Sequence, residues 1–85
     1  MNITPAQKEI IRKLRNGWQL GRYIRYYGGC WRIQQGGLGK GGETLSVKTP
    51  TAETLFENKL IEQSEELSPV IKYQLTELGK TINID

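Results

Sequence analysis

Apolar residues follow a helical period near the beginning of the chain. Four of them recur at spacings of one, three and four residues and so share one helix face: Ile10, Ile11, Leu14 and Trp18. Thr4 is placed to cap this helix, with Pro5 in its first turn and Gln7 completing a capping box. Gly17 follows as a stop signal because glycine adopts positive φ without strain. The pattern predicts a first helix over about residues 4–16.

An alternating pattern rich in aromatic and branched side chains then predicts a β-hairpin over residues 18–35. Gly28-Gly29 suits a two-residue turn, since both central positions of such turns favour glycine. With that turn, Ile24 lies opposite Ile33 on the face directed to the core.

Glycine-rich residues 36–42 predict a flexible connector. In residues 44–48 apolar and polar side chains alternate, although weakly, and this pattern predicts a short third strand. Thr49 and Pro50 predict the start of a second helix, with Thr49 as its N-cap and Pro50 in its first turn, as Thr4 and Pro5 do for the first helix. The expected buried stripe of this helix is Ala52, Leu55, Phe56 and Leu60.

Residues 60–63 and 70–75 predict a second hairpin, and Thr76 is expected to cap a short final helix through about Thr81. The fold class expected is therefore α+β, with one small winged-helix-like domain spanning residues 1–85. Its elements are a helix, a β-hairpin, a second helix, a β-hairpin wing and a short C-terminal helix.

The second half of the chain resembles winged helix-turn-helix regulators of the MarR and PadR type, best over residues 49–81. Residues 51–62 look like a recognition helix and the entry to a wing, and Tyr73-Gln74-Leu75-Thr76-Glu77-Leu78-Gly79-Lys80 looks like the exit turn. The resemblance implies a winged-helix domain that binds DNA and regulates transcription. Where these regulators have a helix before the recognition helix, this chain has the predicted hairpin and the glycine-rich connector.

The composition argues against catalysis. The chain has no histidine, so the commonest general base and metal ligand is missing, and Cys30 is its single cysteine. We therefore expect no enzymatic activity, no cofactor, no bound metal and no small-molecule substrate. The sequence shows neither a membrane-spanning run nor a secretory signal, so we expect a cytoplasmic protein without a membrane partner.

Charge is distributed unevenly along the chain. Residues 1–48 carry nine Lys or Arg against two acidic residues, whereas residues 49–85 carry three Lys against seven acidic residues. A basic first half suggests a polyanionic partner such as nucleic acid. Two solvated faces of opposite sign are the alternative interpretation.

The predicted first hairpin supplies the main candidate site. Its turn places Arg25 opposite Arg32, where a phosphate would relieve their repulsion, and Tyr23 and Tyr27 beside them could stack on bases. The second helix adds polar side chains suited to phosphates or base edges. The candidate nucleic-acid-binding residues are Arg22, Tyr23, Arg25, Tyr27, Arg32, Lys40, Thr51, Thr54 and Asn58.

These residues favour a small DNA-binding regulator of phage or mobile-element type, with double-stranded DNA as its partner. The alternative is a protein-interaction module, such as a phage- or plasmid-type inhibitor or a small toxin on a winged-helix scaffold. Five carboxylates suit a basic protein partner or mimicry of nucleic acid: Glu53, Glu57, Glu62, Glu65 and Glu66.

Overall fold

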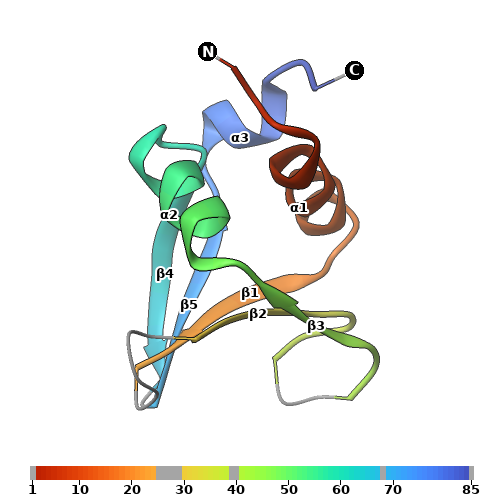
Figure 1. Ribbon diagram of the computed structural model, residues 1–85. Helices are drawn as coiled ribbons and strands as arrows, with labels where there is room; N and C mark the ends of the chain where they lie inside the picture. Colours follow the sequence, from red (N-terminus) through yellow and green to blue (C-terminus); the bar gives the residue numbers. More distant parts are fainter. Residues whose placement is uncertain (1, 25–29, 39–40, 68, 85) are drawn as a thin grey trace.

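The computed structural model describes residues 2–24, 30–38, 41–67 and 69–84. In this part of the chain three helices and five antiparallel strands form a small α+β domain, with α1 and α2 lying over one face of the sheet (Figure 1). The elements are α1 (Pro5–Arg15), β1 (Gln19–Tyr23), β2 (Cys30–Gln34), β3 (Thr44–Val47), α2 (Thr49–Glu57), β4 (Ile61–Leu67), β5 (Val70–Leu75) and α3 (Glu77–Thr81).

The first helix forms as predicted, with its capping box. The side chain of Thr4 accepts from the Gln7 backbone N–H at 3.2 Å, and the Gln7 side chain accepts from the Thr4 N–H at 3.0 Å. Gly17 follows the helix with φ of 91°. Ile10 and Ile11 are buried against the sheet, so the predicted apolar stripe holds α1 in place.

The first hairpin forms in a different register from the one predicted. Arg32 lies opposite Gly21, four positions before Arg25, and Leu20 rather than Ile24 lies opposite Ile33. Leu20 and Ile33 are both 0 % exposed, whereas Ile24 is 44 % exposed, so burial of the leucine sets the register. The predicted pairing of Arg25 with Arg32 is therefore wrong.

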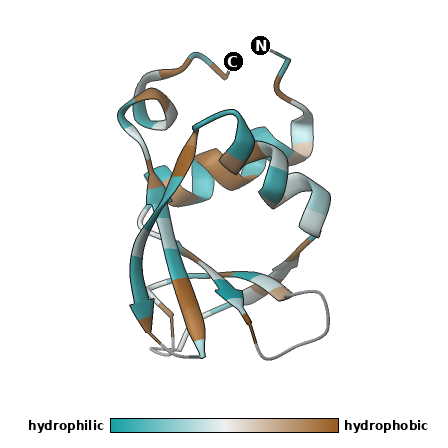
Figure 2. Ribbon diagram, turned by 90° about the vertical axis from the view of Figure 1, so that its left-hand side faces the viewer, coloured by the Kyte–Doolittle hydropathy of each residue, from teal (hydrophilic) through white to brown (hydrophobic). Residues whose placement is uncertain are grey.

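The two hairpins join into one sheet of order β3-β2-β1-β5-β4, because β1 also pairs with β5. Strand β4 is hydrophilic from Glu62 to Glu66 (Figure 2), and it ends at Leu67, which is 45 % exposed. The core lies between the helices and the sheet. Its most fully buried large side chains are Ile11, Leu20, Ile33, Leu55, Leu60 and Ile61.

Helix α2 departs from the prediction at two points. Its N-cap is Lys48, without a side-chain cap hydrogen bond, so Thr49 is the first helical residue rather than the cap. Phe56, expected in the buried stripe, is 48 % exposed. Ala52 and Leu55 are the buried residues of this helix, which ends at Glu57, and Leu60 is buried beyond its end.

Helix α3 is capped by Thr76, as predicted. The Thr76 side chain accepts from the Gly79 N–H at 3.0 Å and its hydroxyl donates to the Lys59 carbonyl at 2.5 Å. The Thr76 N–H also donates to the Leu60 carbonyl at 3.0 Å. Thr76 thus ties α3 to the turn between α2 and β4, where Lys59 has φ of 60°.

We expect Thr76→Val to lower the free energy of unfolding by about 1–2 kcal/mol, because it removes both the cap and the bond to Lys59. Thr76→Ser keeps the hydroxyl and should cost less than about 0.5 kcal/mol. Urea unfolding followed by circular dichroism measures both values. A loss in Thr76→Ser as large as that in Thr76→Val would show that the hydroxyl is not the main contribution of Thr76 to stability.

Candidate functional site

The predicted nucleic-acid-binding residues do not form one surface. Tyr23 and Arg32 lie on the sheet face directed away from the helices, because they alternate with the core residues Leu20 and Ile33 along β1 and β2. Arg32 is exposed and Tyr23 is half-buried. Three further candidates, Arg25, Tyr27 and Lys40, lie outside the described residues.

Arg22 points to the opposite face of the sheet, toward α2. Its guanidinium carbon lies 5.9 Å from the centroid of the Trp31 ring, and its Nε is buried without a hydrogen-bond partner among the described residues. Because Arg22 and Arg32 are separated by the sheet, they cannot hold one phosphate between them.

The polar residues predicted to read bases are half-buried rather than exposed. The Thr54 hydroxyl donates to the Pro50 carbonyl at 2.7 Å, and Asn58 caps the C-terminus of α2. Thr51 lines a groove between α2, α1 and β3. The residues that α2 exposes to solvent are instead Pro50, Glu53, Phe56 and Glu57.

Three of the four cations of α1, Arg12, Lys13 and Arg15, already have partners within the chain. Lys13 donates to Glu9 at 2.7 Å, and Arg12 lies 3.9 Å from the same carboxylate. The hydrogen bond and the charge of Lys13 lower the pKa of Glu9 below its ordinary value, with a smaller contribution from Arg12. Arg15 donates to two carbonyl groups of the α3 region, at 3.1 and 2.7 Å. Of these side chains, Arg15 joins α1 to the α3 region, whereas Arg12 and Lys13 pair within α1.

A cavity of about 410 Å³ opens between α2 and the sheet. Its lining combines aromatic rings with charged groups: Arg22, Trp31, Glu53, Phe56, Glu57 and Tyr73. The rings form a continuous row, since the centroids of Trp31 and Tyr73 are 4.8 Å apart and Phe56 meets Tyr73 edge-on at 5.7 Å. This row leads from the buried Trp31 to the surface at Phe56.

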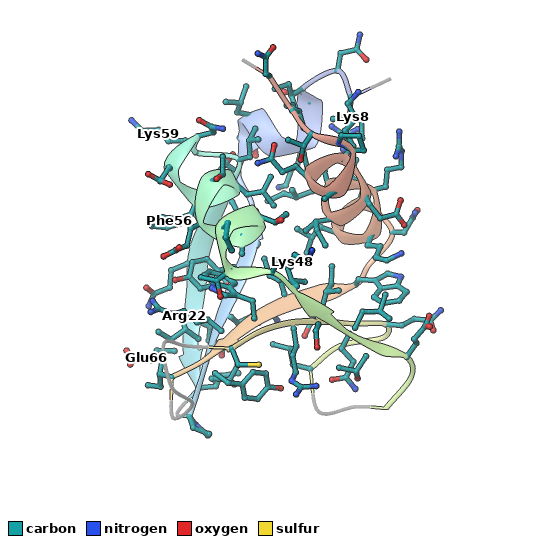
Figure 3. All side chains as sticks on the ribbon, in the orientation of Figure 1. Lys8, Arg22, Lys48, Phe56, Lys59 and Glu66 are labelled. Atoms are coloured by element: carbon teal, nitrogen blue, oxygen red, sulfur yellow. The ribbon has the colours of Figure 1, made fainter. Side chains whose placement is uncertain are left out.

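The acidic character of this side continues onto β4. A second hollow, of about 450 Å³, is lined by Phe56, Glu57, Lys59, Ile61, Glu62 and Thr76, so Phe56 and Glu57 line both hollows and one lysine joins the glutamates at the second. Figure 3 shows Phe56 on α2 above Arg22 on the sheet, with Glu66 nearer the tip of the hairpin. We call Glu53, Phe56, Glu57 and Glu66 the acidic–aromatic face; all four are exposed.

Neither Glu53 nor Glu57 forms an ion pair within the described chain, although Arg22 lines the same cavity. Both carboxylates therefore remain available to a cationic group from outside. Sequence reasoning assigned Phe56 to the core and Arg22 to a basic surface. The signal for the exposed face was the helical spacing of Glu53, Phe56 and Glu57, which lie three and four residues apart on one side of α2.

Other kinds of site are not evident in residues 2–24, 30–38, 41–67 and 69–84. No group of three or more His, Cys, Asp or Glu side chains is placed to hold a metal ion there. None of the helices described is long and apolar enough to cross a membrane. Cys30 is half-buried and forms no disulfide.

Comparison with known proteins identifies no relative. The chain matches no family model, no curated protein sequence and no solved structure.

Proposed function

We propose that this chain is a protein-binding module whose acidic–aromatic face docks against a basic protein. The observation that carries the proposal is Phe56, which is 48 % exposed, lines both hollows and is flanked by carboxylates without ion pairs in the described chain. Large aromatic side chains in such positions commonly anchor interfaces. The surrounding glutamates favour a positively charged partner and speed its association.

The cavity suits a Lys or Arg side chain of that partner. Its methylene groups would pack on Phe56 and Tyr73, and its charge would meet Glu53 or Glu57 at the rim. Because Arg22 also lines the cavity, a cation of the partner is favoured beside Glu53 and Glu57 and not beside the Arg22 guanidinium.

The scaffold we propose is winged-helix-like, with α2 in the position of a recognition helix and β4–β5 as the wing. The succession of α2, a hairpin and a Thr-capped α3 supports this view. On such a scaffold, the glutamates of α2 would be repelled by phosphates, which favours protein over DNA as its partner. An inhibitor or small toxin that occupies a nucleic-acid-binding protein would use a face of this kind.

A second candidate function, nucleic-acid binding, involves the opposite face of the sheet. Gly21 lies between Arg32 on β2 and Lys72 on β5, so two cations flank it in one row. Tyr23 lies two residues further along the same face. The row ends at Glu65, which lies opposite Lys72 on β4, so its positive charge is limited to two side chains.

Titration calorimetry against a short Lys/Arg-rich peptide and against a short DNA duplex, each at low and physiological ionic strength, tests both functions. We expect the peptide to bind, and Glu53→Lys with Glu57→Lys to weaken binding at least about tenfold. Glu77→Lys, an exposed charge reversal on α3, is the matched control.

Absence of peptide binding at low ionic strength would contradict the protein-binding proposal. Duplex binding that Arg32→Ala with Lys72→Ala weakens would favour the second candidate instead, and its salt dependence should then decrease in that variant.

A further inference from the structure

The two edges of the sheet differ in their protection against pairing with another strand. The β4 edge carries Glu62, Glu65 and Glu66, and a bulge interrupts its ladder between Gln63 and Glu65. Charged side chains and bulges are the usual means by which edge strands avoid intermolecular pairing. This edge is therefore protected.

The β3 edge lacks these features. Residues Thr44–Val47 include no charged residue, β3 pairs with β2 alone, and the strand forms the outer border of the sheet (Figure 1). Leu45 is 37 % exposed. Uncharged edge strands with exposed apolar residues are prone to pair with another strand.

The backbone groups that β3 offers can be identified from its ladder with β2. The Gln35 N–H donates to the Glu43 carbonyl at 2.9 Å, which makes these two residues a hydrogen-bonded pair. Such pairs alternate along an antiparallel ladder, so Leu45 also directs its N–H and C=O toward β2. Thr44 and Ser46 direct theirs away from the sheet.

We propose that β3 pairs antiparallel with β3 of a second copy of this chain, about a two-fold axis through Leu45. Thr44 of each copy then lies opposite Ser46 of the other, and both pairs exchange N–H···O=C bonds in both directions. The two Leu45 residues form the central non-hydrogen-bonded pair, in which side chains approach most closely.

The charges that flank β3 are complementary in this arrangement. Glu43 precedes the strand and Lys48 follows it; both are exposed and neither forms an ion pair within the described chain. Antiparallel pairing places the Glu43 end of each copy beside the Lys48 end of the other. A register centred on Ser46 would instead set Thr44 opposite Lys48, whose carbonyl already accepts from the Ala52 N–H at 3.1 Å.

The pairing also covers apolar surface. Leu45 lines a groove of about 300 Å³ with Ala6, Ile10, Ile33 and Val47, and a second Leu45 would lie at its open side. A contact between two short strands is smaller than the roughly 1,200 Å² of standard stable interfaces. We therefore expect a dimer that forms reversibly as the protein concentration rises.

Sedimentation velocity over a range of protein concentrations tests the proposal. We expect Leu45→Lys, which sets two like charges on the axis, to raise the dimer dissociation constant at least tenfold. Ser46→Pro should have a similar effect, because it removes an N–H that faces the free edge and not β2. Gln63→Lys on the β4 edge is the matched control and should leave the constant unchanged.

Amide hydrogen exchange gives a second measurement that needs no variant. The amides of Thr44 and Ser46 should exchange more slowly as the concentration rises, whereas that of Leu45 should not change. A single monomeric species at all concentrations, or a dimer that Leu45→Lys leaves intact, would overturn the proposal. Dimerisation should persist in the Glu53→Lys, Glu57→Lys variant. The dimer proposal and the protein-binding proposal can therefore fail independently of each other.

Discussion

Gly79→Ala is expected to lower the free energy of unfolding by about 2–3 kcal/mol, since overpacking a buried position forces the backbone to move. A Cβ on Gly79 would overlap the carbonyl oxygen of Leu60 and lie 3.0 Å from Leu75 Cδ2. The Leu60 carbonyl is held in place because it accepts from the Thr76 N–H at 3.0 Å. Helix α3 would therefore have to shift away from the start of β4. Urea unfolding measures the loss.

Gly17 provides the matched control, because it is required for a different reason. It has φ of 91°, and a Cβ there would meet no atom within 4 Å. Gly17→Ala should cost about 1 kcal/mol through backbone strain, and Gly17→Asn should cost less, since asparagine tolerates positive φ. At Gly79 the order of the two costs reverses: Gly79→Asn should cost more than Gly79→Ala, because the larger asparagine side chain overlaps more with its neighbours. A Gly79→Ala variant as stable as the wild type would show that α3 does not pack closely on Leu60.

The features that could be predicted from the sequence are those determined by residues close together in the chain. The capping box at Thr4 and Gln7 involves residues three apart, and so does the cap from Thr76 to Gly79. Each satisfies a backbone N–H that a helix end leaves without a partner, so the requirement is visible locally.

The register of the first hairpin could not be predicted in this way. Gly28-Gly29 is the best local turn signal, but β1 ends at Tyr23 and β2 begins at Cys30. The register follows from burial of Leu20, which also lies opposite Tyr73 on β5, a residue more than fifty positions away in the chain. Such a contact outweighs a local turn preference, and it places Arg22 and Arg32 on opposite faces.

The exposure of Phe56 on α2 was missed for a related reason. Two stripes compete on this short helix, one formed by Thr51, Thr54 and Asn58 and the other by Glu53 and Phe56. Helical periodicity cannot decide which of them neighbours α1 and which faces solvent. The position of α1 against the sheet decides it, and that position depends on the whole core.

Phe56→Ala is expected to weaken binding of the Lys/Arg-rich peptide about 30-fold or more, as truncation of an aromatic residue at the centre of an interface commonly does. The loss of folding stability should be only about 1 kcal/mol, because half of the side chain is exposed and its main ring contact is the edge-on one with Tyr73. Calorimetric titration and urea unfolding of the same preparation measure the two effects.

Leu78→Ala is the matched control, since Leu78 is 43 % exposed but lies on α3, outside the acidic–aromatic face. It should leave peptide binding unchanged. Phe56→Tyr should retain most of the affinity, because the added hydroxyl points from an exposed ring into water. A small effect of Phe56→Ala beside a large effect of Glu57→Gln would show that the peptide is held by charge alone. Equal losses from Phe56→Ala and Leu78→Ala would place the binding surface elsewhere.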